Sequence, residues 1–396
     1  MRVIVELYDD DMLNNLLAAM TFRPQVLLMV CEHRVAYDEA LKARFMTLLR
    51  GAGVSSEVRF ISAGSNAPGT LEEVFSDILR EWPDARFDIT GGRDIPLFTA
   101  GRFCQKENVP AFFYSRMLGK YRNAYHCPEA AGVEGASLTV GQLLDLAGGK
   151  YMGHGRFEQL FDLDALTEED FDDAATLWDI YRAFRGVWSS QILYMQQLVK
   201  RVYMRYPLRV GNVPVNLYGS HLNLDFLKAL EQAGLVHSVK LTNKTVDLQF
   251  KSMAVRCMLA DAGLVLELYA YGLLCRQERF SDVSTSVMID WNGQVYETAN
   301  LVNEVDIVAT RGTSSLFVSC KIGQLARSDV DELYTLAARF GGIGTHACLL
   351  SVVSLAETQP TVYKRACDLG ICIIEGDDLL GDDFPRLLAD TVEQWL

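Results

Sequence analysis

Metal-binding patterns of cysteine and histidine are absent from this sequence. Its nine cysteines form no CxxC pair, and its six histidines show neither HxH nor HExxH spacing. We therefore expect no zinc site. Scattered, unpaired thiols are instead typical of a protein that remains reduced in a cytoplasm.

Long apolar runs and a leader segment are missing as well. No stretch approaches the ~18 uninterrupted apolar residues of a membrane-spanning helix. The start, MRVIVELYDDDML, has one basic residue followed by acids, unlike a signal peptide. These features predict a soluble, cytoplasmic protein with no membrane partner.

Basic residues are scarce relative to acidic ones. The formal charge is −14 over 396 residues, so the chain as a whole repels polyanions such as nucleic acids. This argues against a DNA-coating protein but is compatible with a nuclease that uses divalent cations or a local basic patch. The densest basic patch is interpreted as a solvated connector or as a track for a nucleic-acid backbone; it comprises Lys200, Arg201, Arg205 and Arg209.

The first 150 residues alternate apolar strand signals with amphipathic helices. Strands are expected at 3–7, 25–31, 57–64, 86–92 and 110–116. Continuous apolar strands separated by helices are typical of a parallel sheet covered on both faces. The pattern predicts an α/β protein with an N-terminal Rossmann-like, doubly wound domain at 1–150.

Two further units follow in the sequence. Residues 151–250 are helical and acidic at first, then show one helix and a hairpin, which indicates either a winged-helix-like module or a plain structural connector. Residues 251–396 return to alternating helices and strands and form a second α/β unit.

Charged residues mark two strands of this C-terminal unit. In NEVDIVATRGTSSLFVSCKIG, Asp306 interrupts one apolar run and Lys321 ends the next. A buried acid and a buried lysine are each costly unless they pair or bind something. A structural ion pair is one interpretation. The other is a site for a metal ion and a phosphate group.

The second interpretation assigns a role to each of five residues. Hydrolysis of a phosphodiester requires a cation that activates water and a positive group near the phosphate. Asp306 is then a metal ligand, and Glu267 reaches the metal directly or through water. The Cys320 carbonyl offers another oxygen, while strand alternation places Ser319 and Lys321 on one face.

A Gly-Gly turn follows the strand expected at 86–92. In DITGGRD the glycines allow close backbone approach, and free amides at a helix start favour phosphate. Thr90 offers a hydroxyl and Arg93 a charge for phosphate or base. A simple strand-to-helix connection also accounts for Gly91 and Gly92, and no GxGxxG pattern supports an ordinary dinucleotide cofactor.

These segments together resemble the ancillary nucleases of type III CRISPR systems. Such proteins join an N-terminal CARF sensor to a C-terminal restriction-endonuclease-like domain of the PD-(D/E)xK superfamily. The resemblance runs from VELYDDDMLNNLLAAMTFRPQ through DITGGRD to GLVLELYAYGLL, the Asp306–Lys321 segment and DELYTLAARFGG. It implies a CARF sensor at 1–150, a connector at 151–250 and a nuclease-like domain at 251–396.

The resemblance also implies a ligand at the carboxyl ends of the sensor strands. CARF domains pair about a twofold axis and hold a cyclic oligoadenylate across it, which favours an even-numbered ring such as cyclic tetra-adenylate. The implied ring-binding residues are Tyr8, Asp9, Glu32, Ser62, Gly64, Thr90, Gly91, Gly92 and Arg93. For Asp9 and Glu32, capping of the following helices is an alternative role.

One departure from the superfamily pattern concerns the second acid. Many members carry Asp or Glu two residues before the lysine, where this chain has Ser319. Glu304 is the candidate substitute, because it lies two residues before Asp306 on the same strand face. A solvated charge at a strand end is the alternative interpretation of Glu304.

The expected protein is a homodimeric endonuclease that a cyclic oligoadenylate activates and that depends on Mn²⁺ or Mg²⁺. Its substrate is DNA, RNA or both. Two alternatives remain open at this point: a nucleic-acid-binding regulator with an inactive nuclease fold, and an enzyme that degrades the cyclic nucleotide in the sensor.

Overall fold

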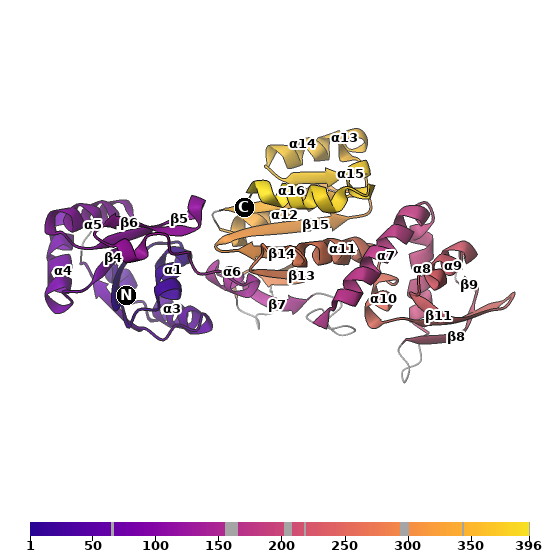
Figure 1. Ribbon diagram of the computed structural model, residues 1–396, viewed down its shortest axis with the longest axis horizontal. Coiled ribbons are helices and arrows are strands. Elements are labelled where there is room, and N and C mark those ends of the chain that lie inside the picture. Colours follow the sequence, from indigo (N-terminus) through magenta and orange to yellow (C-terminus); the bar gives the residue numbers. More distant parts are fainter. Residues whose placement is uncertain are drawn as a thin grey trace.

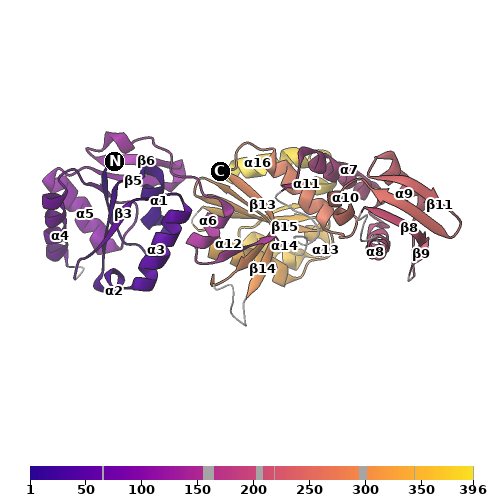
Figure 2. The ribbon, with the colours of Figure 1, turned by 90° about the horizontal axis from the view of Figure 1, so that it is seen from below.

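The protein consists of three parts arranged along one axis. The computed structural model describes residues 1–64, 67–154, 165–201, 208–217, 219–293, 301–342 and 344–395. Two perpendicular views place the N-terminal domain at one end and the C-terminal sheet in the middle, with a smaller helix-and-hairpin unit at the other end (Figures 1 and 2). Within the described residues, no helix combines the length and the apolar character needed to cross a membrane.

The N-terminal domain is a doubly wound sheet, which confirms the predicted fold class. The strand order is β3-β2-β1-β4-β5-β6, and only β6 runs antiparallel to its neighbour. The strands are β1 (Val3–Leu7), β2 (Val26–Cys31), β3 (Glu57–Ser62), β4 (Arg86–Asp88), β5 (Ala111–Ser115) and β6 (Lys120–Tyr125). The helices are α1 (Met12–Phe22), α2 (His33–Ala36), α3 (Glu39–Gly51), α4 (Pro68–Glu81), α5 (Asp94–Glu107), η1 (Arg116–Leu118) and η2 (Pro128–Ala130).

Apolar side chains on both faces of this sheet hold the helices in place. Every residue of β1 and β2 is buried, as their unbroken apolar sequence predicts. Helices α1 and α3 pack on one face, and α4 and α5 on the other. Strand β4 is shorter than expected, because it ends at Asp88, whose carboxylate accepts the Thr90 N–H at 2.7 Å and so starts the turn.

The middle of the chain forms a helical unit with a small sheet of order β11-β12-β8. Helix α9 followed by the β11–β12 hairpin gives it a winged-helix-like arrangement. Its elements are α7 (Glu168–Phe184), α8 (Trp188–Val199), β8 (Arg209–Pro214), β9 (Asn216–Leu217), β10 (Ser220–His221), α9 (Leu224–Gln232), β11 (Val236–Leu241) and β12 (Thr245–Phe250). Of the basic patch, Arg205 lies outside the described residues.

The C-terminal domain is built on a mixed sheet of order β17-β16-β15-β14-β13-β7. Its strands are β7 (Lys150–His154), β13 (Asp282–Asp290), β14 (Val302–Arg311), β15 (Ser314–Lys321), β16 (Thr345–Ser351) and β17 (Cys372–Glu375). Its helices are α6 (Val140–Leu146), α10 (Met253–Met258), α11 (Leu264–Cys275), α12 (Arg327–Phe340), α13 (Leu355–Thr358), α14 (Pro360–Asp368), α15 (Gly376–Leu380) and α16 (Phe384–Trp395). Strand β7 joins this sheet from a position far upstream of residue 251.

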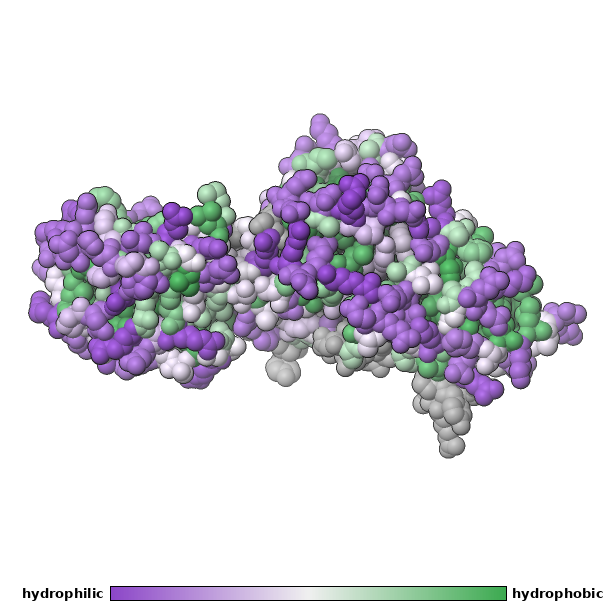
Figure 3. Space-filling view, viewed as in Figure 1, coloured by the Kyte–Doolittle hydropathy of each residue, from purple (hydrophilic) through white to green (hydrophobic). Residues whose placement is uncertain are grey.

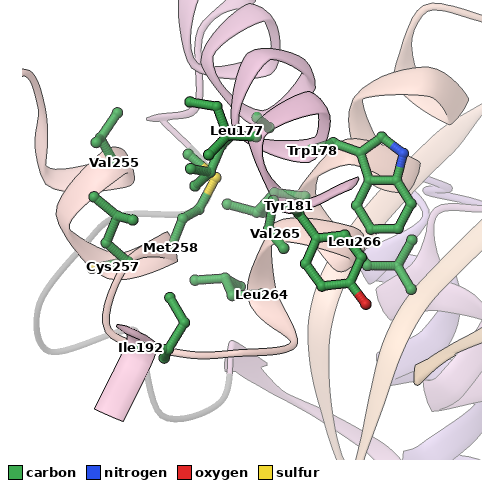
Figure 4. Packing of buried hydrophobic residues seen from close by; sticks show 14 of the residues in the cluster. Leu177, Trp178, Tyr181, Ile192, Val255, Cys257, Met258, Leu264, Val265 and Leu266 are labelled. Atoms are coloured by element: carbon green, nitrogen blue, oxygen red, sulfur yellow. The ribbon is translucent and has the colours of Figure 1, made fainter. Parts of the chain in front are cut away.

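One large core joins the middle unit to the C-terminal domain. It contains side chains from α7, α8, α10 and α11 together with one face of the large sheet. In Figure 4, Trp178 and Tyr181 of α7 lie beside Val265 and Leu266 of α11. The outer surface in the view of Figure 3 is covered largely by hydrophilic residues.

The N-terminal domain touches the C-terminal sheet at the turn between β14 and β15. The Leu138 N–H donates to the Gly312 carbonyl at 2.9 Å, and the Thr310 hydroxyl donates to the Leu138 carbonyl at 2.6 Å. The hydroxyls of Tyr114 and Thr313 lie 3.3 Å apart and are buried. The opposite ends of β14 and β15 therefore point away from this contact.

Two buried carboxyl groups lie in the centre of the N-terminal sheet. β1 and β4 pair in register from Ile4 with Arg86 and Val5 with Phe87, which places Glu6 beside Asp88. Glu6 Oε1 and Asp88 Oδ2 are buried and accept no hydrogen bond from the described residues. Burial raises the pKa of Asp88 to about 7, and burial and the neighbouring Asp88 raise the pKa of Glu6 well above its ordinary value.

We predict that this pair makes the folded state less stable as pH rises. The folded protein keeps on Asp88 a proton that the unfolded chain releases near pH 3.8. Stability should therefore fall between that pH and about 7, by up to ~1.4 kcal/mol per pH unit. Asp88→Asn keeps the Oδ1 acceptor for Thr90 and should flatten this dependence, as measured by thermal unfolding across the pH range. Asp84→Asn, at an exposed ion pair with Arg2, is the matched control and should keep the wild-type slope.

Candidate functional site

Strands β14 and β15 separate at Asp306. Their ladder runs from Arg311 opposite Ser314 to Ile307 opposite Val318 and ends there. Beyond that point, Asp306 Oδ2 accepts the Cys320 N–H at 2.6 Å and the Ser319 hydroxyl at 3.1 Å. The carboxylate thus bridges the two strands where their backbone hydrogen bonds stop.

Lys321 lies next to this carboxylate. Its Nζ is 3.7 Å from Asp306 Oδ2, and the Lys321 side chain is 36% exposed. Burial is the largest single effect and lowers the pKa of Lys321, but the nearby acidic groups, Asp306 first and then Cys320, Asp329 and Glu332, together outweigh it, so the net pKa is raised. The ammonium group is therefore positively charged at neutral pH, so it can stabilise negative charge but cannot act as a general base.

The sequence-predicted residues Glu304, Asp306, Ser319 and Lys321 line one pocket. Glu304 accepts a hydrogen bond from the Ser286 hydroxyl. Ser286 itself has a left-handed backbone (φ 51°), which marks a local break in β13. Glu304 is thus held at the pocket wall by a neighbouring strand and is not a freely solvated charge.

Helix α12 contributes two acids that sequence reasoning missed. Asp329 and Glu332 line the same pocket, and both raise the pKa of Lys321. The sequence could have indicated that these two acids lie together, because residues three apart in a helix share one face. The side chain of Glu332 also accepts a hydrogen bond from the Asn303 amide.

Glu267 lies beneath the sheet strands and does not line the pocket. Its carboxylate accepts the Thr285 hydroxyl at 2.7 Å, and this hydroxyl is 3.1 Å from the Asp306 carbonyl oxygen. Glu267 is only 6% exposed. The structure therefore connects Glu267 to the Asp306 backbone through Thr285, and its role as a metal ligand stays a prediction, as does that of the Cys320 carbonyl.

The donor atoms around Asp306 suit a hard cation. They are carboxylate and hydroxyl oxygens, which Mg²⁺ and Mn²⁺ prefer. In the part of the chain that the structure describes, no three Asp, Glu, His or Cys side chains lie close enough to hold a metal as they stand. The chemistry of the pocket fits such a cation, and binding would require the acids of β14 and α12 to draw together.

A second pocket lies at the carboxyl ends of the N-terminal strands. Tyr8, Glu32 and Arg93 line it, together with apolar side chains that include Ala63 and Pro96. Arg93 Nη1 donates to Glu32 at 2.7 Å, and Arg93 Nη2 donates to both carboxylate oxygens of Asp10 at 3.1 Å. Among the described residues that line this pocket, Arg93 carries the only guanidinium, and it is held between two acids.

Four other predicted ring-binding residues make contacts within the fold. The Thr90 hydroxyl donates to Asp88 and accepts the Tyr114 N–H. Asp9 accepts the N–H groups of Asp11 and Gly92. A Cβ atom at Gly91 would lie 2.5 Å from the Asn14 Cβ, and one at Gly92, where φ is 118°, 2.8 Å from the Leu7 Cβ.

These contacts give the turn a structural role, and its contact with a ring stays a prediction. The capping role considered for the two acids is not observed as a side-chain bond to a helix N-terminus. Asp9 accepts the N–H of Asp11, which is itself the capping residue of α1, and Glu32 makes no side-chain capping bond at the start of α2. The Ser62 hydroxyl accepts the Gly64 N–H at 3.3 Å, and neither residue is among those that line the pocket.

One family model matches most of the C-terminal domain. Residues 253–395 match the family model described as "Card1-like, endonuclease domain". This stretch contains Glu304, Asp306, Lys321 and both acids of α12. The C-terminal domain is thus similar to a Card1-like endonuclease domain.

Two solved structures share the fold of the whole chain. One is the crystal structure of protein VC1899 from Vibrio cholerae, with 16% identity, a TM-score of 0.72, and coverage of 100% of this chain and 97% of that one. The other is Can2 from Sulfobacillus thermosulfidooxidans in complex with cyclic tetra-adenylate, with 17% identity, a TM-score of 0.65, and coverage of 100% and 99%. No curated protein sequence matches the chain. The expected resemblance and fold class are confirmed by these findings.

Proposed function

We propose that this protein is a metal-dependent endonuclease of type III CRISPR defence that a cyclic oligoadenylate activates. The observation that carries the proposal is the pocket around Asp306 and Lys321, which lies within the part of the chain that matches an endonuclease family. The substrate is a nucleic acid, DNA, RNA or both.

The residues of the pocket divide the work of phosphodiester hydrolysis. A divalent cation, when bound, would supply charge neutralisation and an activated water. Asp306 would hold this cation through its carboxylate group. Lys321, already positively charged, stabilises the negative charge that develops on the phosphate.

Many superfamily members carry a second acid at the position of Ser319. In this chain, Glu304 or helix α12 would supply that acid instead. Glu304 lies two residues from Asp306 on the same strand, as expected from the sequence. Glu332 lies across the same pocket on α12, one helical turn after Asp329. A carboxylate from either element would give the cation a second oxygen ligand of the type that hard divalent ions prefer.

The N-terminal pocket is the proposed site of the activator. Support comes from the fold shared with Can2, whose structure contains cyclic tetra-adenylate. Tyr8 offers an aromatic face and Arg93 a guanidinium, which suit a base and a phosphate respectively. We propose that two copies of the chain pair about a twofold axis, so that one ring contacts the same pocket on both.

Exposed apolar side chains near the pocket support this pairing. Phe98 and Ile95 on α5 are 64% and 47% exposed, and Tyr37 after α2 is 67% exposed. All three follow strand ends at the same edge of the sheet as Arg93. Large apolar side chains at one rim suit an interface between two copies.

One experiment tests the proposed function directly. The full chain is incubated with single- and double-stranded DNA and RNA, with Mg²⁺ or Mn²⁺, and with a panel of cyclic oligoadenylates. Cleavage that requires both the metal and a ring supports the proposal. Binding of nucleic acid without cleavage would favour the regulator, and linear products from the ring itself would favour a ring-degrading enzyme.

We predict that Asp306→Ala reduces cleavage by more than about 100-fold. The substitution removes the carboxylate that bridges the two strands and faces the cation position. Ring affinity, measured by calorimetry, should stay at the wild-type value, because the sensor pocket lies in another domain. Asp331→Ala is the matched control for loss of one acid, because Asp331 lies on α12, pairs with Arg365 and is not among the residues that line the pocket. Wild-type turnover in Asp306→Ala would place the active site elsewhere.

Glu304→Gln and Glu332→Gln identify the second acid. The variant that removes a true ligand should weaken Mn²⁺ binding by about 10- to 100-fold, because a neutral amide oxygen holds a hard cation less well. Calorimetric titration with Mn²⁺ measures this without any cleavage assay. Equal Mn²⁺ affinity in both variants and wild type would exclude both residues and return the question to Glu267 or Asp329.

Arg93→Ala should raise the activator concentration needed for half-maximal cleavage by about 10- to 100-fold. The ring loses a charge-assisted contact on each protomer, although Arg93 also gives up its contacts with Glu32 and Asp10 when it binds phosphate. Maximal cleavage at saturating ring should remain, because the nuclease pocket is unchanged. Arg80→Ala on α4, also ion-paired and exposed, is the control; equal activator sensitivity of all three proteins would contradict the proposed ring site.

A further inference from the structure

Two cysteines face each other on neighbouring strands of the C-terminal sheet. β16 and β17 are parallel, and Cys348 is the register partner of Cys372. Directly opposed residues on adjacent strands project from the same face, and the strands lie about 4.8 Å apart. That spacing falls within the Cα separation of about 4.4–6.8 Å found in disulfides.

The two thiols are already in contact. A hydrogen bond joins the Cys348 and Cys372 side chains. Both are free cysteines, and both pack on the core that lies under α11 and α16. The two sulfur atoms are therefore neighbours before any bond forms between them.

The environments of the two thiols differ in a way that suits stepwise oxidation. Cys348 is fully buried, whereas Cys372 is partly exposed on β17, the edge strand of the sheet. The hydrogen bond from Cys348 lowers the pKa of Cys372 against the opposing effect of burial. A partly exposed thiol with a lowered pKa is the more reactive nucleophile.

Most other cysteines of the chain lack these features. Burial raises the pKa of five thiols and makes them poor nucleophiles: Cys31, Cys104, Cys127, Cys257 and Cys275. Burial also raises the pKa of Cys320. Cys367 is exposed but lies on α14, not opposite another cysteine in a strand pair.

We propose that Cys348 and Cys372 form a reversible disulfide, so that the edge of the nuclease sheet is a redox modification site. The oxidant is a low-molecular-weight disulfide such as glutathione disulfide. The Cys372 thiolate attacks one sulfur of glutathione disulfide, forms a mixed disulfide and releases one glutathione thiolate. The Cys348 thiol then loses its proton, attacks Cys372 Sγ and expels the second glutathione. Two protein thiols are oxidised and one glutathione disulfide is reduced.

The geometry also explains why this bond is reversible. Side chains opposed across parallel strands have Cβ atoms separated by about the strand spacing, which exceeds the mean of ~3.8 Å in disulfides. Closing the bond draws the edge strand inward, and strained disulfides are the more easily reduced ones.

On its other side β16 pairs with β15, where Leu349 is opposite Ser319 and Ser351 is opposite Lys321. The modified strand is thus the direct neighbour of the strand that carries Ser319 and Lys321.

The test uses the full chain equilibrated over a range of glutathione to glutathione disulfide ratios. Free thiols are then blocked by alkylation, and peptides are mapped by mass spectrometry without reduction. We expect a Cys348–Cys372 cross-linked peptide that appears with oxidation and disappears with dithiothreitol. In Cys348→Ser, Cys372 should instead accumulate a glutathione adduct, because the resolving thiol is gone. Cys367→Ser should leave the cross-link unchanged.

Two results would overturn the proposal. One is wild-type protein in which Cys348 and Cys372 remain fully alkylated at the most oxidising ratio. The other is a stable glutathione adduct on wild-type Cys372, which would show that Cys348 does not resolve it. Both are read from the wild-type chain, so neither depends on whether a serine variant folds.

Discussion

The carboxylate of Asp306 takes the place of a backbone hydrogen bond between two strands. It accepts the Cys320 N–H at 2.6 Å at the point where the β14–β15 ladder ends. Without this acceptor, a buried amide would be left without a partner, which is costly. The same carboxylate also favours the charged form of Lys321 and accepts the Ser319 hydroxyl, so the arrangement of the pocket depends on it.

The N-terminal pocket follows a related principle, in which charged side chains hold one another in place. Arg93 is positioned by Glu32 and Asp10, and the turn that carries it is fixed by Asp88, Thr90 and the close approach of Gly91 to α1. A pre-positioned guanidinium loses little conformational freedom on binding. A polyanionic ligand must, however, compete with these two acids for the Arg93 guanidinium. This competition favours a ligand that also contributes stacking and apolar contacts.

Much of this organisation can be predicted from the sequence, because it follows from the apolar patterns of the strands and helices. The all-buried runs of β1 and β2 predicted the parallel sheet, and the Asp306 and Lys321 positions predicted a shared pocket. The acids of α12 were missed because their contribution depends on how that helix packs across β14 and β15, which no local pattern records. Strand β7 was assigned to the connector because its partner, β13, lies more than a hundred residues later. For Thr90 and Asp9 the contact with a ligand stays a prediction, and their internal partners, Tyr114 and Gly92, become visible only in three dimensions.

The β14–β15 hairpin touches the N-terminal domain at its turn and carries Asp306 and Lys321 at its far end. At the turn, the Thr313 hydroxyl meets that of Tyr114, whose own amide is bonded to the Thr90 hydroxyl in the Gly-Gly turn. Between turn and pocket the ladder is unbroken, so the ribbon has no hinge along its length. Because β13 and β16 pair with the outer sides of these two strands, a rotation at the end that contacts the N-terminal domain would move the whole sheet and, with it, the acids at the far end.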